Sequence, residues 1–413
     1  MKLEKKKSVF LVCLIVILLV SVFSVRLLLS NERPQGEEYK ILAEQLLNEA
    51  REEFENIRGL SVREVTLEVV NQSWVIEHWG KAYADPEIEE ILREENIYKA
   101  LFMISQDVSL YETRLEWTGS FSAAKWQGKI YLVEENFDVT DEFKVKSTFV
   151  HELTHILQET YSIPERPTTF DGDKALTSLK EGDATFMADI FKNQGVVPIF
   201  WSVTPDDETS LSVPLALMFS DEIQPSLPDT INKINRFPYR YGVEFVKELY
   251  AQGGWNAVEE AYGNPPNTTE QIMHPEKYFT KEDAQTVEAP SITGEWNKTK
   301  TERFGEYFIQ VMLDNWLSTD DAEQAAEGWG GDTLTYYERD DDFLFMWNIA
   351  WDSRDDAHEF YLAFQEMMYK TSAEKHNCSY WFADGRYISI QWNEKSTLII
   401  SSANETLVQQ SFF

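Results

Sequence analysis

The sequence predicts an α+β protein with an N-terminal transmembrane helix and a smaller C-terminal α+β domain. Three observations lead to this expectation. An apolar run follows a short basic N-terminus, helical spacing of apolar residues dominates up to about residue 288, and short strand-like segments recur beyond it. With 413 residues, of which 43% are hydrophobic, the chain is long enough to form two domains with sizeable cores.

An almost uninterrupted apolar run covers residues 8–25, directly after three lysines at 5–7. As a helix this run would be about 27 Å long, and the leucines at 27–29 extend it to the ~30 Å of a hydrocarbon core. The lysines favour a cytoplasmic tail at 1–7, so we expect a single-pass signal anchor at 8–29 and an extracytoplasmic remainder. A cleaved signal peptide is the alternative, although no small-x-small cleavage site follows the run.

Charge and cysteine content narrow the class of protein further. The formal net charge of −34 argues against nucleic acid as a partner, because such binders need a basic patch. Beyond the apolar run the only cysteine is Cys378, which excludes an intrachain disulfide there. An exported protein without disulfides is more typical of prokaryotes than of eukaryotes.

The segment 30–60 contains an amphipathic helix at 37–58, which is either a stalk or the first helix of the following domain. We expect a catalytic domain at 61–288. Its predicted elements, in chain order, are strand 65–70, helix 86–104, strand 125–133, helix 141–161, helix 173–191, an irregular Pro-rich stretch at 197–228, and helices at 241–251 and up to 262.

The pattern changes from about residue 289. Helices at 302–317 and 355–371 are expected to alternate with short strands, which predicts a small α+β domain at 289–413. The expected strands are 333–337, 343–350, 379–382, 387–392 and 397–400.

The strongest chemical signal is the segment His151-Glu152-Leu153-Thr154-His155. Two histidines four residues apart on a helix project from one face, about one turn apart, and can share a tetrahedral ion. Glu152 could then reach a water at the metal without being a ligand itself. The alternatives are a structural zinc site or histidines that merely pack on a helix.

A catalytic zinc needs a third protein ligand, and Glu181 in the segment 179–184 is the best candidate. It lies on the next predicted helix, and we expect Gly182 beside it to allow a close approach to the first helix. The alternative for Glu181 is a solvated helix acid that happens to precede a glycine.

With these residues the sequence resembles the gluzincins, zinc peptidases that take two histidines from one helix and a glutamate from the next. The resemblance covers about 131–181. It implies His151, His155 and Glu181 as Zn²⁺ ligands and Glu152 as general base. The segments 179–184, 237–239, 253–258, 268–278 and 328–332 further resemble a group of largely uncharacterised prokaryotic zincin-like proteins, so we expect a zincin-like fold for 61–288.

The sequence departs from the thermolysin pattern at Thr185, where that pattern has an aspartate four residues after the glutamate ligand. The acid that would orient a ligand histidine is therefore unassigned, with Asp183, Asp189 and Glu159 as candidates. Asp183 is better explained as a cap, a loop residue or an interhelical hydrogen-bonding group than as a ligand.

A second donor is normally needed for the oxyanion that forms during amide hydrolysis. His274, in a polar segment before Pro275, is the first choice, with Tyr239 and Tyr241 behind it. His274 could equally order its own loop, and tyrosines more often serve packing.

These expectations combine into a membrane-anchored extracytoplasmic zinc metallopeptidase that acts on peptide or protein substrates. An extended substrate would add as a strand beside 129–133, which we expect at the edge of a sheet. The rival readings are a catalytically silent zinc-containing surface scaffold and a chaperone-like peptide-binding protein. A Glu152→Gln change discriminates them, because it should abolish hydrolysis but spare binding.

Overall fold

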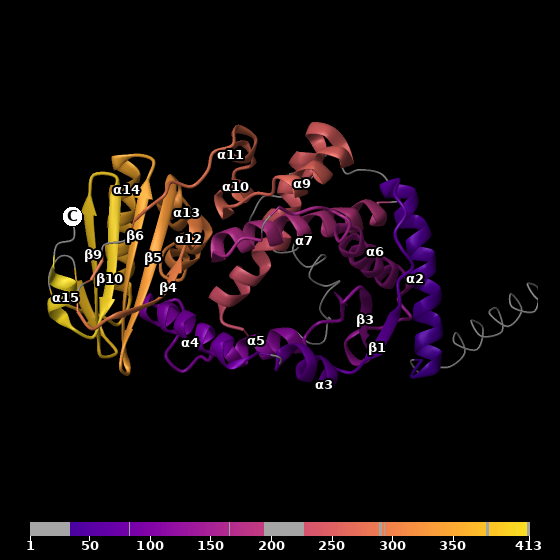
Figure 1. Ribbon diagram of the computed structural model, residues 1–413, viewed down its shortest axis with the longest axis horizontal. Coiled ribbons are helices and arrows are strands. Elements are labelled where there is room, and N and C mark those ends of the chain that lie inside the picture. Colours follow the sequence, from indigo (N-terminus) through magenta and orange to yellow (C-terminus); the bar gives the residue numbers. More distant parts are fainter. Residues whose placement is uncertain are drawn as a thin grey trace, which may run out of the picture.

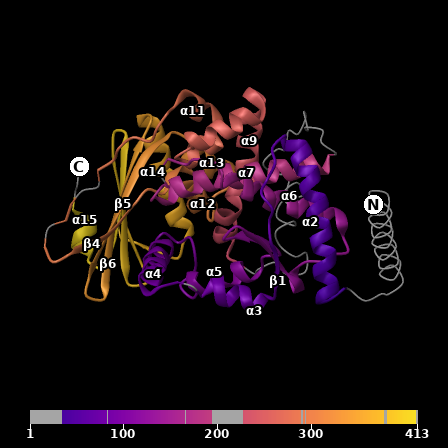
Figure 2. The same cartoon turned by 45° about the vertical axis from the view of Figure 1, so that its right-hand side comes forward.

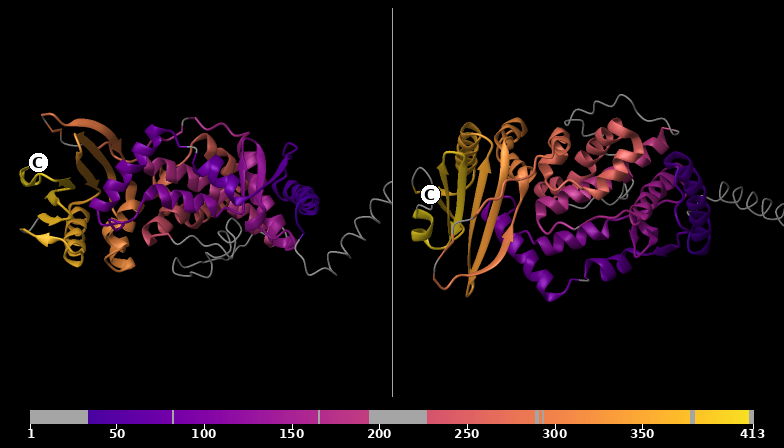
Figure 3. Two further views of the ribbon diagram at one scale, coloured as in Figure 1. Left: turned by 90° about the horizontal axis from the view of Figure 1, so that it is seen from below. Right: turned by 45° about the horizontal axis from the view of Figure 1, so that its top comes forward.

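The computed structural model describes residues 34–81, 83–164, 166–193, 227–288, 291–292, 294–376 and 380–410. A seven-stranded sheet lies at one end of the elongated molecule, a three-stranded sheet lies toward the other, and helices fill the space between them (Figure 1). Figures 2 and 3 show the same order from other directions, with the first described helix at the end opposite the larger sheet.

The described part of the chain is α+β, but the predicted fold class is wrong in its membrane-spanning element. None of the helices within the ranges given above is long and apolar enough to cross a membrane. The segment 8–29, for which we predicted that helix, lies outside the described residues, as does most of the Pro-rich stretch at 197–228.

Helix α2 (Glu37–Arg58) is a packed element of the fold and not a free stalk. Its apolar face, which includes Tyr39, Leu46 and Phe54, is buried in one hydrophobic cluster with α6 (Glu142–Gln158). Gly59 ends the helix in the left-handed conformation, with φ 75°, and its N–H donates a hydrogen bond to the backbone carbonyl of Glu55. Of the two interpretations of this helix, the first helix of the domain is therefore the correct one.

The small sheet has the order β1-β3-β2, with β1 (Leu67–Val70) parallel and β2 (Ala123–Trp126) antiparallel to β3 (Lys129–Val133). Gln127 and Gly128 connect β2 to β3 with φ values of 47° and 73°, the signature of a tight hairpin turn. The expectation that 129–133 forms the edge was wrong, because β3 is the central strand and β2 is an edge.

Helices α7 (Phe170–Lys192) and α9 (Asp229–Gly263) cross at two glycines. A Cβ atom added to Gly182 would overlap the backbone carbonyl of Gly242, and one added to Gly242 would overlap that of Ser178. Gly182 therefore allows a close approach, but to α9 and not to α6 as we expected. The long helix α9 bends at Gly253 and Gly254, where the backbone leaves helical geometry.

Shorter elements complete the first two thirds of the chain. They are α3 (Gln72–Val75), the π-helical turn η1 (Ile76–Gly80), α4 (Asp85–Ala100), α5 (Leu110–Gly119), the 3₁₀ turn η2 (Glu134–Asn136), α10 (Thr269–Met273) and α11 (Pro275–Thr280).

The large sheet is antiparallel throughout, in the order β4-β5-β6-β10-β9-β8-β7. Its strands are β4 (Asn297–Glu302), β5 (Trp329–Arg339), β6 (Asp342–Trp351), β7 (Glu374–Lys375), β8 (Tyr380–Ala383), β9 (Arg386–Asn393) and β10 (Ser396–Ser402). Alternate residues of β6 point to opposite faces, with Phe345 and Trp347 on one and Leu344 and Met346 on the other. Four helices cover these faces: α12 (Gly305–Asp314), α13 (Thr319–Ala326), α14 (Arg354–Lys370) and, on the second face, α15 (Glu405–Gln409).

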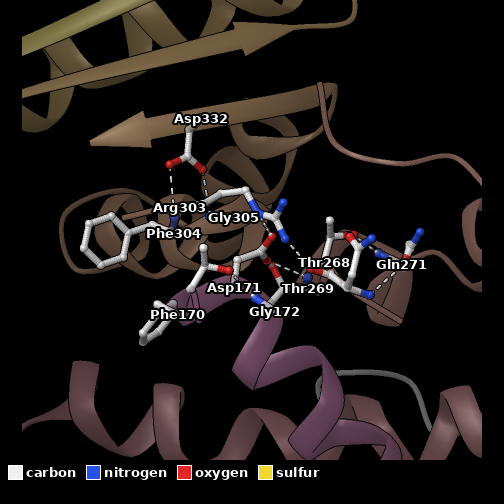
Figure 4. A network of polar contacts seen from close by, with 12 residues as sticks. Phe170, Asp171, Gly172, Thr268, Thr269, Gln271, Arg303, Phe304, Gly305 and Asp332 are labelled. Carbon is white, nitrogen blue, oxygen red and sulfur yellow. Dashed lines mark hydrogen bonds and ion pairs between the residues drawn. The ribbon is translucent and has the colours of Figure 1, made fainter. Parts of the chain in front are cut away.

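A buried polar network joins α7 and α10 to the start of α12 and to β5 (Figure 4). Asp171 accepts hydrogen bonds from the backbone and hydroxyl of Thr269 at 2.6 and 2.7 Å and pairs with Arg303 at 2.9 Å. Asp332 accepts from the backbone N–H groups of Phe304 and Gly305 at 3.0 and 2.8 Å. The main hydrophobic cluster also continues from α7 and α9 into the large sheet, so the core is not divided at residue 289.

Candidate metal centre

Three side chains from two helices converge between α6 and α7. The Nε2 atoms of His151 and His155 lie 3.1 Å apart. The Oε2 atom of Glu181 lies 3.3 Å from His151 Nε2 and 3.4 Å from His155 Nε2. The structure thus brings together the three residues for which the sequence predicted metal ligation.

These separations can be compared with the geometry that a zinc ion requires. Zinc binds histidine nitrogen and carboxylate oxygen at about 2.0–2.2 Å in a tetrahedral arrangement, so its donor atoms stand about 3.3–3.5 Å apart. The three distances, 3.1, 3.3 and 3.4 Å, lie at or just below the edges of such a tetrahedron. The residues present therefore fit a zinc ion, with the fourth position open.

The hydrogen bonding around the three donors also fits a cation. Among the described residues, the Oε2 atoms of both Glu181 and Glu152 are buried without a hydrogen-bond donor. A buried carboxylate oxygen without a donor is costly unless a cation compensates it. Glu152 itself is 1% exposed and receives a hydrogen bond from the backbone N–H of Lys125 on β2.

The electrostatics of the site favour positive charge at His155. Burial lowers the pKa of His155, but the carboxylates of Glu181 and Glu152 outweigh it and raise the pKa to about 9. Burial raises the pKa of Glu181, and the two histidines reverse this and hold it far below its usual range. Burial raises the pKa of Glu152 above that of an ordinary glutamate, which suits a group that accepts and releases a proton.

A glutamine that the sequence analysis missed orients one of the ligands. Gln158 Oε1 lies 3.0 Å from His155 Nδ1, so that ring nitrogen is the donor and Nε2 faces Glu181. The Gln158 amide in turn donates to the backbone carbonyl of Lys180 at 2.9 Å and to Asp183 at 3.3 Å. Gln158 lies three residues after His155 on the same helix, so this spacing could have identified it.

Asp183, which accepts a hydrogen bond from Gln158, is itself held by two buried side chains. It pairs with Arg58 of α2 at 2.7 Å, with both side chains fully buried, and accepts from Tyr262 at 2.9 Å. Of the roles expected for Asp183, the structure shows that of an interhelical hydrogen-bonding group, and its carboxylate reaches His155 through Gln158. The other two acids considered for orienting a ligand histidine have different partners. Asp189 lies 3.4 Å from Lys192, and Glu159 pairs with Arg63 and Lys125.

The metal centre opens into a cavity of about 610 Å³. Strand β2 contributes Ala124 and Lys125 to its wall, α6 contributes Glu152 and His155, and α7 contributes Lys180 and Glu181. Tyr239 of α9 lines the same cavity, and its hydroxyl is hydrogen-bonded to Glu181.

The other predicted donors lie elsewhere. His274 is not among the residues that line this cavity; its Nε2 lies 3.1 Å from Glu306 of α12. Tyr241 packs against Phe237 and Tyr307, with ring centroids 5.1 and 5.6 Å away. Tyr239 is therefore the one of the three predicted donors that lines the cavity at the metal centre.

A second acidic group, formed by Glu270, Glu282 and Asp352, does not have the character of a cation site. The ammonium of Lys277 lies 2.6, 3.1 and 3.5 Å from these three carboxylates and already supplies their positive charge.

Residues 292–410 match a family model described as a domain of unknown function (DUF8575). The matched segment covers the seven-stranded sheet with α12 to α15 and contains none of the residues of the metal centre. No curated protein and no solved structure matches the chain. The chemistry of the metal centre therefore has to be argued from its own residues.

Proposed function

We propose that this protein is a zinc-dependent peptidase in which His151, His155 and Glu181 hold the metal and Glu152 acts as general base. The observation that carries the proposal is the set of three donor separations, 3.1, 3.3 and 3.4 Å, beside a buried glutamate oxygen without a donor. A structural zinc site is closed by four protein ligands, whereas three ligands and an open position are typical of a catalytic one.

A bound zinc would supply Lewis acidity, which polarises a carbonyl and makes a water molecule more acidic. Glu152 takes the proton of the attacking water at Oε2, the atom that has no donor, and later delivers it to the amide nitrogen as the C–N bond breaks. The Lys125 N–H holds the Glu152 carboxylate in place during both transfers. The Tyr239 hydroxyl, which lines the same cavity and is hydrogen-bonded to Glu181, is the donor that we assign to the developing oxyanion.

Peptide is the favoured substrate because the cavity is bordered by the edge of a sheet. Ala124 and Lys125 belong to β2, which pairs only with β3 among the described strands. An extended peptide can hydrogen-bond to such an edge and would then pass beside Glu152.

Hydrolysis of a mixed peptide library by the purified full chain tests this proposal. We expect wild-type protein to cleave and Glu152→Gln to be slower by a factor of about 10²–10⁴ with its metal retained. Glu159→Gln is the matched control, because Glu159 lines the same cavity but pairs with Arg63 and Lys125. Equal cleavage by wild type and Glu152→Gln would contradict the proposal.

A further inference from the structure

A second cavity, of about 230 Å³, lies beside the one at the metal centre. Helices α4 and α5 form one of its sides, and α7 and α9 form the other. Three rings stand between the two cavities. Trp117 lines the second, Phe121 and Tyr239 line the first, and the three pack together with Trp117 and Phe121 centroids 6.2 Å apart.

The two cavities lie along the same faces of α7 and α9. Lys174 in the second cavity precedes Glu181 by seven residues, which is two helical turns on one face and about 10 Å along the axis. Asn235 in the second cavity precedes Tyr239 by four residues, which is about one helical turn, so these two residues also lie on one face of their helix. The residues that line the two cavities therefore follow one another along these two helices, and a bound peptide that reached both cavities would run past the three rings.

The polar lining of the second cavity leaves Lys174 without a direct ion pair. Arg114 pairs with Glu94 at 2.6 Å, and Asp173 pairs with Arg166 at 3.1 Å. Lys174 is partly buried, and its ammonium has no carboxylate within 4.0 Å in the described part of the chain; the carboxylates of Glu94 and Asp173 act on it from farther away, and the ring of Phe170 lies 5.6 Å from Nζ. Burial lowers the pKa of Lys174 to about 8, so the ammonium still carries its charge at neutral pH.

We propose that this second cavity is a subsite that binds a carboxylate of the substrate through Lys174. The proposal rests on the proposed peptidase function and specifies its substrate class. An extended peptide advances about 3.3–3.6 Å per residue, so a separation of about 10 Å places the carboxylate two to three residues from the cleaved bond. The residues between would cross the aromatic wall of Trp117, Phe121 and Tyr239.

Two sources can supply this carboxylate, the C-terminus of a short peptide and an Asp or Glu side chain. Cleavage of paired five-residue peptides separates them. One pair differs only in a free or amidated C-terminus, and the other carries Glu or Gln at the third residue from the cleaved bond. A charge-assisted contact predicts that kcat/KM for the carboxylate member exceeds that of its neutral partner by about 10- to 100-fold.

Lys174→Met should remove this preference by lowering kcat/KM for the carboxylate peptide alone, mainly through KM. Lys174→Arg should retain it, because the charge remains. Lys370→Met is the control for loss of a lysine, since Lys370 pairs with Glu366 on α14, away from both cavities. Cleavage without a preference in wild type, or a preference that survives in Lys174→Met, would overturn the subsite and leave the peptidase function standing.

Binding of the same peptides to the Glu152→Gln variant, measured by calorimetry, tests the subsite independently of cleavage. If wild type cleaves nothing but the carboxylate peptide still binds about tenfold or more tightly than its neutral partner, and Lys174→Met abolishes the difference, the subsite stands without the peptidase function. Equal binding of the two peptides in that case would overturn the subsite.

Discussion

The Nε2 atom of His155 and the Oε2 atom of Glu181 lie 3.4 Å apart, although the two residues belong to different helices. Gln158 connects these helices, because its side chain contacts the His155 ring on α6 and the backbone carbonyl of Lys180 on α7. The geometry of the metal centre thus depends on a residue that is not itself a ligand.

Gln158→Ala should weaken zinc binding by about 10- to 100-fold, because the His155 ring loses the acceptor that fixes its tautomer and orientation. Competition against a chromogenic chelator measures the affinity. Glu159→Gln, one residue away, should leave the affinity unchanged. Equal zinc affinity in Gln158→Ala and wild type would contradict the assigned role.

Arg58→Met should reduce the free energy of unfolding by about 3–5 kcal/mol, because it leaves the fully buried carboxylate of Asp183 without its cation. Arg63→Met removes a pair with Glu159 in which the side chains are 51% and 35% exposed, and should cost less than about 1 kcal/mol. Urea unfolding of both variants tests this contrast. Similar losses of unfolding free energy would show that the buried pair contributes no more to stability than the exposed one.

Gly182→Ala should destabilise the fold by about 1–3 kcal/mol or more, since its methyl group would force α7 and α9 apart at Gly242. Gly263 provides the comparison, because it also lies within a helix, α9, and an added Cβ would meet nothing within 4 Å. Gly263→Ala should be neutral or slightly stabilising. Thermal unfolding distinguishes the two, and a stable Gly182→Ala would disprove the close crossing.

Burial raises the pKa of Asp171 to about 6, although Arg303 and Thr269 oppose the shift. The folded state therefore binds a proton more tightly than the unfolded state, whose pKa is near 3.8. This contribution to stability is present at acidic pH and is lost as pH rises from about 4 to 6, by at most about 1.4 kcal/mol per pH unit.

Asp171→Asn should flatten the pH dependence of the unfolding free energy in that window. Asp173→Asn controls for the loss of a carboxylate on the same helix, because Asp173 lies near the surface beside Arg166. Unfolding curves at several pH values between 4 and 7 provide the measurement. An unchanged slope in Asp171→Asn would contradict the assignment.

Helix periodicity made the local elements predictable from sequence. The helices now numbered α2, α6, α7 and α14 were expected within a few residues of their observed ends, because each carries an apolar stripe with the spacing of a helix turn. Strand β4 escaped prediction because its six residues, Asn297–Glu302, are all polar, as an exposed edge strand allows.

Contacts between distant parts of the chain could not be read from the sequence in the same way. The pairing of Arg58 with Asp183 spans 125 residues, and no local pattern signals it. The central position of β3 depends on its parallel partner β1, which lies some sixty residues earlier. His274 was predicted as an oxyanion donor because it lies in a polar segment. Its contact with Glu306 arises only when α12 packs beside it.

Metal analysis of the purified full chain, by mass spectrometry of wild type and His155→Ala after dialysis against a weak chelator, tests the central claim most directly. The arrangement of His151, His155 and Glu181 predicts one zinc per chain in wild type and none in the variant, with both proteins folded by circular dichroism. A folded wild-type protein that holds no zinc when zinc is supplied, or a variant that retains it, would contradict the account.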